Sequence, residues 1–199
     1  MQQHFAQRTT MAKTPEYDKL DVYFNDDGGS GRFRGVSAGG SPQMAAIFKS
    51  WIEAIKDQHI VAVSGGDQFR PTASPGGTDS TAFSWIGLNG IGFQQDGLEY
   101  GTRTHHSNAD TYDHVQKDDV MQSSMIEAWF TYNAATREEM LPRIPTPAPD
   151  PNAKSHEWSA TLIQSLRVKP LEVSPFITAP VVWAARAETG CRNISNEKR

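Results

Sequence analysis

The sequence predicts an α/β fold, because short apolar runs of strand length alternate with segments whose apolar residues recur at helical spacing. A chain of 199 residues is long enough to bury the core of one ordinary domain. Residues 142–151 are rich in proline and can form only an extended segment. We therefore expect one α/β domain in residues 1–141, a linker in residues 142–152, and a poorly ordered or appended tail in residues 153–199.

The first strand is predicted at residues 19–25, an apolar run that stops at an Asp- and Gly-rich turn. Polar and apolar residues then alternate over residues 32–36, which predicts a second strand. The glycine-rich turn between these two strands favours a hairpin. Two further strands are expected at residues 60–63 and 90–93.

Three helices are expected between these strands and after them. Ser41 and Pro42 are typical of an N-cap and a first helical residue, and they begin a helix that extends to about Ile55. A short helix begins near Thr78, and a long one covers about residues 115–140. The face of the long helix that we expect in the core consists of Val120, Met121, Met125, Ala128, Trp129 and Tyr132.

Composition argues against several classes of partner. The formal net charge of −4 gives no broad basic field, so we expect neither nucleic acid nor an anionic membrane as a partner. Cys191 is the only cysteine, which excludes an internal disulfide and a cysteine-based zinc site. We see no signal-peptide pattern at the N-terminus and no apolar run long enough to span a bilayer. The localisation stays open.

Candidate metal ligands follow two of the predicted strands. Asp27 comes directly after the first strand, and His105 and His106 lie in the long polar loop of residues 97–114. Carboxylate and imidazole groups at the carboxyl ends of strands suit a hydrolytic zinc site. Each observation also has a simpler explanation, because Asp is favoured in turns and loop histidines are often only solvated.

Four segments occur in an order that strengthens the metal interpretation. They read Tyr-Phe-Asn-x-Asp-x-Gly-x-Gly from Tyr23, Gly-Gly-Thr-Asp-x-x-x-Phe from Gly76, Gly-x-Gly-Phe-x-Gln-Asp from Gly90, and Thr-His-His-Ser-Asn-x-Asp-Thr-Tyr-Asp from Thr104. Together they resemble successive landmarks of the zinc-dependent exopeptidase family of clan MH, over about residues 1–142. That family includes secreted bacterial aminopeptidases, glutamate carboxypeptidase and, as a divergent branch, glutaminyl cyclase.

The resemblance implies a mixed β-sheet with helices on both faces and a site for two zinc ions that acts on peptide substrates. The two ions share a bridging Asp, each is completed by a His and a further carboxylate, and a Glu is the general base. By motif, Asp27 matches a ligand of one zinc ion and His106 a ligand of the other. His105 stands where the family often has a tyrosine that contacts the oxyanion.

Further positions match the family in part. Asp79 caps the short helix that lines the substrate pocket, and Phe83 on the same helix is a further candidate for that pocket. Ser80 stands where the family commonly has His. Asp110 matches a carboxylate that orients a ligand or fixes its loop. Asp26 replaces a residue that is usually apolar, so it adds a charge beside Asp27.

The family's His-x-Asp motif and its Glu-Glu pair of base and ligand are not found in this sequence. The one adjacent glutamate pair, Glu138-Glu139, falls at the end of the last helix. We therefore expect a C-terminal half of the catalytic domain, truncated at its N-terminus and inactive alone. A partner chain that supplies the missing half is one way to complete it.

Two alternatives stay open, a non-catalytic scaffold or receptor-like relative of the same fold and acyl transfer of the glutaminyl cyclase type. Within the exopeptidase interpretation, the sequence does not separate aminopeptidase from carboxypeptidase activity. Relatives are often secreted or periplasmic.

Overall fold

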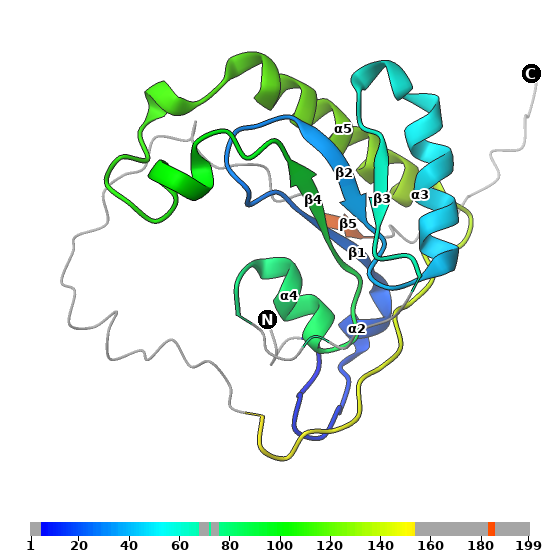
Figure 1. The fold of residues 1–199 in the computed structure, drawn as a ribbon. Helices are drawn as coiled ribbons and strands as arrows, with labels where there is room; N and C mark the ends of the chain where they lie inside the picture. Colours follow the sequence, from blue (N-terminus) through cyan, green and yellow to red (C-terminus); the bar gives the residue numbers. More distant parts are fainter. Residues whose placement is uncertain (1–4, 68–71, 73–75, 154–182, 186–199) are drawn as a thin grey trace, which may run out of the picture.

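The computed structural model describes residues 5–67, 72, 76–153 and 183–185, which form a mixed sheet of five strands in the order β3-β2-β4-β1-β5 (Figure 1). The strands are β1 (Leu20–Asn25), β2 (Phe33–Ser37), β3 (Ala62–Ser64), β4 (Gly90–Gln95) and β5 (Trp183–Ala185). The helices are α2 (Pro15–Lys19), α3 (Pro42–Ala54), α4 (Asp79–Trp85) and α5 (Lys117–Thr136). No helix in these ranges is long and apolar enough to cross a membrane. Most of the expected tail, residues 153–199, lies outside the described residues.

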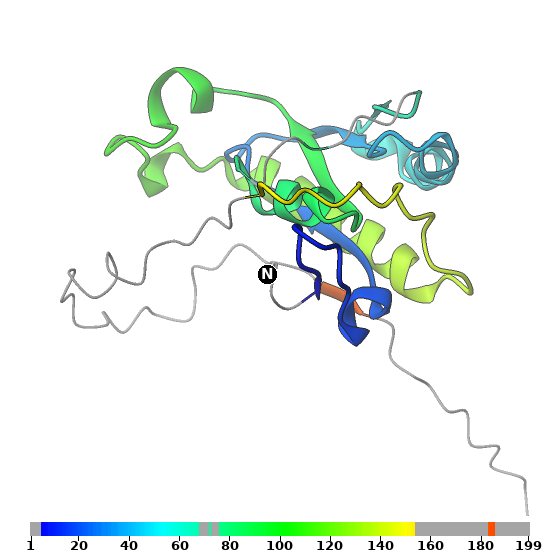
Figure 2. The same cartoon turned by 90° about the horizontal axis from the view of Figure 1, so that it is seen from below.

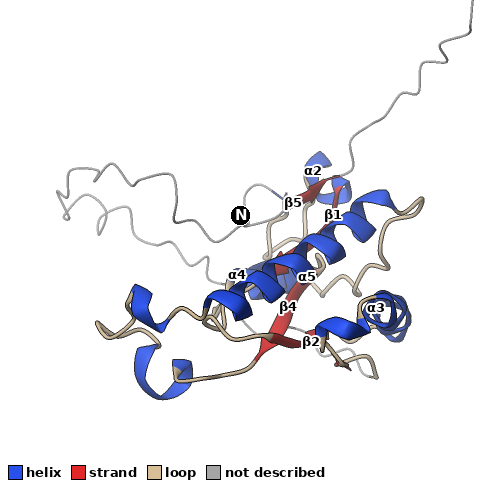
Figure 3. Cartoon of the chain, turned by 90° about the horizontal axis from the view of Figure 1, so that it is seen from above, coloured by secondary structure: helices blue, strands red, loops and turns tan. Residues whose placement is uncertain are grey.

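Helices cover both faces of the sheet, as Figures 1 and 3 show. On one face α3 and α5 pack against Phe24 of β1, and the rings of Phe48 and Phe130 meet edge to face with centroids 5.3 Å apart. On the other face α4 packs through Phe83, whose ring stacks on Tyr23 at 4.2 Å. Successive β1 side chains point to opposite faces, so one strand serves both cores. The predicted mixed sheet with helices on both faces is confirmed.

The predicted hairpin between the first two strands is wrong, because β4 lies between β1 and β2. It pairs in parallel with β1, with Tyr23 opposite Gly90, and antiparallel with β2. All six residues of β1 are buried, which is typical of a strand with elements on both faces. Two strand spacings amount to about 10 Å, a gap that residues 26–32 readily cross.

The buried face of α5 differs from the predicted one, since Met121, Met125 and Tyr132 are 60%, 39% and 64% exposed. Gln122 occupies the core side instead. Its side chain accepts a hydrogen bond from Phe33 N at 2.9 Å and donates one to Phe33 O at 3.0 Å. Apolar residues lie on more than one side of α5, so hydrophobic burial alone allows more than one rotation of the helix. The hydrogen bonds between Gln122 and the β2 backbone help to stabilise the observed rotation. The buried residues of α5 are Gln122, Ser123, Ile126, Glu127, Phe130 and Ala134.

The proline-rich segment after α5 is extended and lies against the core. Leu141 and Ile144 are buried, with 2% and 4% of their surfaces exposed. Asn89, itself fully buried, donates from Nδ2 to Asp21 O at 3.0 Å and accepts from Ile144 N at 3.2 Å. Asp21 in turn accepts a hydrogen bond from Leu141 N at 2.8 Å. The start of the segment is therefore fixed to β1 and to the residue before β4.

We predict that Asn89→Ala lowers the free energy of unfolding by about 2–4 kcal/mol, because it removes two buried hydrogen bonds and takes from Ile144 N–H its Asn89 acceptor. Urea denaturation followed by circular dichroism measures the change. Asn108→Ala is the control, since Asn108 is exposed in a loop and its truncation should cost less than about 0.5 kcal/mol. Equal effects of the two substitutions would contradict the assigned role of Asn89.

Candidate active site

The carboxyl end of β1 is anchored to the start of α4. Asn25 Oδ1 accepts hydrogen bonds from Ser80 N at 3.1 Å and from Thr78 Oγ1 at 3.4 Å. Thr78 also caps α4, exchanging hydrogen bonds with Thr81 in a capping box. Asp26 and Asp27 follow directly, so the Asn25 anchor fixes the backbone from which both carboxylates project. Asp27 is exposed, whereas Asp26 is partly buried.

The glycine turn after Asp27 is held by the last residue of β4. Gln95 donates from Nε2 to Gly29 O and to Gly31 O, both at 3.0 Å. Gly29 has a φ of +98°, and a Cβ there would approach the Tyr100 ring to 3.0 Å. Glycine is therefore required where the turn meets Tyr100. The turn could not take this course with a larger residue at that position.

The segment after β4 extends from one end of the sheet (Figures 1 and 2) and begins with the π-helical turn Tyr100–Thr104. Tyr100 donates its hydroxyl to Asp27 O at 3.2 Å, and its ring lies 4.8 Å from that of His105. The rings of His105 and His106 stack at 3.9 Å. Tyr100 thus links the turn that carries Asp27 to both histidines.

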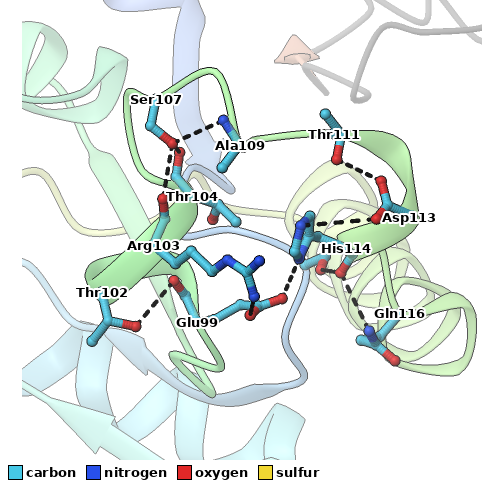
Figure 4. Close-up of polar contacts among 11 residues, drawn as sticks. Glu99, Thr102, Arg103, Thr104, Ser107, Ala109, Thr111, Asp113, His114 and Gln116 are labelled. Carbon is cyan, nitrogen blue, oxygen red and sulfur yellow. Dashed lines mark hydrogen bonds and ion pairs between the residues drawn. The ribbon is translucent and has the colours of Figure 1, made fainter.

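His106 has a φ of +54°, a left-handed conformation that is uncommon for residues other than glycine. Such a conformation costs on the order of 1 kcal/mol and persists only where the surroundings impose it. Ser107 is one cause, because its hydroxyl donates to Thr104 O at 3.0 Å and accepts from Ala109 N at 3.2 Å (Figure 4).

A polar cluster closes the far end of this loop. Glu99 binds the His114 ring through Nδ1 and lies 3.6 Å from the Arg103 guanidinium (Figure 4). Asp110, predicted to orient a ligand or fix the loop, is exposed, and its backbone N donates to Ser107 O at 3.2 Å. The sequence did not point to Glu99 or His114.

The predicted substrate residues of α4 have different surroundings. Asp79 is exposed and accepts a hydrogen bond from the Tyr23 hydroxyl at 3.4 Å. Burial, with Asp79 as the next cause, raises the pKa of Tyr23 to about 12. Ser80 is buried and its hydroxyl lies 2.8 Å from that of Thr78. Phe83 is only 1% exposed and belongs to the core.

The described residues do not complete a metal site on their own. Among them no group of three or more His, Cys, Asp or Glu side chains is arranged to hold an ion. A catalytic zinc ion takes three protein ligands and a water, so Asp27 and His106 do not suffice even for one ion. The Glu138-Glu139 pair follows the end of α5 and is exposed.

A cavity of about 600 Å³ adjoins this region, and no sequence motif predicted it. Its walls come from the glycine turn, the π-helical turn and the start of α5, and they include Asp26, Tyr100 and Asp110. Asp27, His105 and His106 are not among its lining residues.

Two carboxyl groups beside the cavity are perturbed by burial. Burial, with a smaller effect of Asp27, raises the pKa of Asp26 to about 6, although the Gly28 backbone amide acts in the opposite direction. Glu127 on α5 is 4% exposed, and burial together with the nearby charge of Asp26 raises its pKa to about 7. In the sequence, Glu127 is marked only by its helical spacing from Ser123, Phe130 and Ala134, which places it on the same face of α5. That spacing becomes informative only once this face is known to be the buried one.

The sequence model described as Peptidase family M28 matches residues 3–130 of the chain. The match includes β1 to β4, the histidine loop and much of α5. No curated protein and no solved structure matches the chain.

We predict that the free energy of unfolding falls as pH rises from about 4.5 to about 7, because the folded-state pKa of Glu127 lies above its unfolded value over that interval. Below it the carboxyl is protonated in both states; within it the unfolded chain releases the proton first. Glu127→Gln should remove about 1–3 kcal/mol of this fall. Urea denaturation at several pH values provides the measurement.

Glu53→Gln is the matched control, because Glu53 is exposed on α3 and pairs with Lys56 at the surface. Its pH profile should follow that of the unmodified chain. If Glu127→Gln also follows the unmodified profile, the carboxyl of Glu127 is not the group whose proton uptake stabilises the fold.

Proposed function

Since the chain belongs to peptidase family M28, a family of metallopeptidases, we propose that it supplies part of a two-zinc exopeptidase site. In this proposal Asp27 binds one zinc ion and His106 binds the other. The observation that carries it is the chain of contacts from the Asp27 carbonyl through Tyr100 to the stacked rings of His105 and His106. Family membership itself supports peptide hydrolysis, and the two-zinc exopeptidase assignment is the proposed part.

The conformation of the histidine loop supports a functional role over a purely structural one. Left-handed non-glycine residues are concentrated at functional sites, and His106 adopts that conformation in an exposed loop. His105 lies beside His106 with its ring exposed, so it is the candidate donor to the oxyanion of a bound substrate.

The other predicted residues have supporting roles in this proposal. Asp79 is exposed at the start of α4 and can contact a substrate, while Ser80 fixes the α4 cap beside Asn25. Asp110 is placed to orient the loop that carries His106. Phe83 supports α4 from the core, and a direct substrate contact for it is not part of the proposal.

The ligands that Asp27 and His106 lack are not found among the described residues, so in this proposal other residues of the same protein or a second chain supply them. We propose a partner chain as one source of them, carrying a His-x-Asp motif and a Glu-Glu pair, the groups that a two-zinc site of this family needs beyond these two ligands. The general base is among the groups such a partner would contribute. Glu127 does not replace it, since its carboxyl is buried behind Asp26.

We predict that the purified chain holds less than one zinc ion per molecule after dialysis and releases no amino acid from aminoacyl or peptidyl reporters. One retained ligand per ion is too few for tight binding, and loss of a general base alone costs about 10²–10⁴-fold in rate. Atomic absorption and a chromogenic assay provide the two readouts. Two tightly bound ions with zinc-dependent turnover would contradict the incomplete site.

Residual zinc binding tests the two ligands separately. Asp27→Asn and His106→Asn should each weaken it by about tenfold or more, and Asn tolerates the left-handed backbone of residue 106. His59→Asn is the control, since His59 also has a positive φ, of +59°, on another part of the surface. Co-expression with a chain carrying the missing motifs should restore activity only when Asp27 and His106 are intact. Restored activity in His106→Asn would exclude His106 as a ligand.

A further inference from the structure

The cavity beside the candidate site has an uncompensated acidic wall. Asp26, Glu99 and Asp110 line the cavity. Glu99 is paired with Arg103 and His114, whereas Asp26 has no cationic partner and accepts only from the Gly28 backbone amide. Asp26 Oδ1 is buried and has no hydrogen-bond partner among the described residues. A buried carboxylate oxygen without a partner is costly, because it has lost water and gained nothing in exchange.

Glu127 is a second buried acid close to Asp26. Its side chain is 4% exposed, no hydrogen bond to its carboxyl occurs within the described residues, and it lies close enough to Asp26 for the two charges to repel. The positive end of the α5 helix dipole is equivalent to about half a charge, and His114 contributes at most one. Arg103 offsets Glu99, and the carboxylates of Asp26 and Asp110 outweigh the dipole and His114 together, so the cavity favours a cation.

The remaining walls suit an aliphatic stem. Leu98, Val115 and Val120 line the cavity and are 53%, 43% and 36% exposed. Tyr100 contributes an aromatic ring that can face a cation. Long basic side chains bury their methylene groups on such surfaces and place the charge at a polar end. A volume of about 600 Å³ accommodates a lysine or arginine side chain with water.

We infer that this cavity is a subsite for a basic side chain, an ammonium or guanidinium group on an aliphatic stem, with Asp26 as its principal charge partner. Tyr100 connects the cavity with the candidate site, because it lines the cavity and its hydroxyl donates to Asp27 O in the site. The assignment of this basic side chain to a peptide substrate rests on the proposed function. The binding of a cation in the cavity does not depend on that function.

The test compares two neutral-backbone probes, N-acetyl-lysine methylamide and N-acetyl-norleucine methylamide, which differ in the side-chain ammonium. Binding to the full ¹⁵N-labelled chain is followed by NMR in the presence of a zinc chelator, so the result does not depend on the metal site. The lysine probe should shift amides around Gly29, Leu98 and Val115 and bind about tenfold or more tightly than the norleucine probe. Equal affinity of the two probes, or shifts confined to another surface, would overturn the inference.

Asp26→Asn should weaken binding of the lysine probe about fivefold or more and leave the norleucine probe unchanged. Asp110→Asn, an exposed loop position, provides a second variant should Asp26→Asn fold poorly, with a smaller loss expected. Asp57→Asn removes the same charge at an exposed site outside this cavity and should have no effect. Unchanged affinity in the variants of the cavity wall, or an equal loss in Asp57→Asn, would refute the subsite. If Asp27→Asn and His106→Asn left zinc binding unchanged while the probe results held, only the proposed function would be contradicted.

Discussion

The burial of β1 on both faces is the constraint on which the rest of the structure depends. Val22 and Phe24 enter the core under α3 and α5, and Tyr23 enters the core under α4. Asp21 holds the segment that follows α5, and Asn25 anchors the cap of α4. Every layer therefore contacts this strand, and the turn that carries Asp27 begins where the strand ends. A shift of one residue in β1 would exchange its two core faces and move Asp27 out of the site.

Local signals in the sequence were sufficient for most elements. Ser41 accepts a hydrogen bond from Met44 N at the start of α3, as its cap position predicts, and the apolar run of residues 19–25 contains β1. The order of strands in the sheet was not local information. The turn of residues 26–32 is compatible with a hairpin and with a step over one strand, and only the pairing of β4 with both neighbours decides between them. The rotation of α5 was ambiguous for a similar reason, since its apolar residues occupy more than one side.

In the candidate site, too, some residues could be predicted from local sequence and others only from the tertiary structure. Asp27 and His106 could be selected because they sit in motifs with fixed internal spacing. Asp26 and Glu127 could not be paired from sequence, since they are far apart along the chain and meet only because α5 presents Gln122 and Ser123, with Glu127, to the sheet. The contribution of Tyr100 also depends on a tertiary detail, the close approach that Gly29 permits. Spacing thus predicts ligands, whereas packing determines the charges around them.

The pairing of β5 with β1 joins residues near opposite ends of the chain, with Leu20 opposite Ala185. A ribosome adds about 5–20 residues per second, so the outer edge of β1 waits on the order of ten to thirty seconds for that strand during synthesis. In that interval its backbone donors and acceptors are available to any other extended segment nearby. Translation speed and chaperone access therefore influence how much of this chain reaches its native sheet, and a nascent chain that stalls before residue 183 presents an open strand edge to its neighbours.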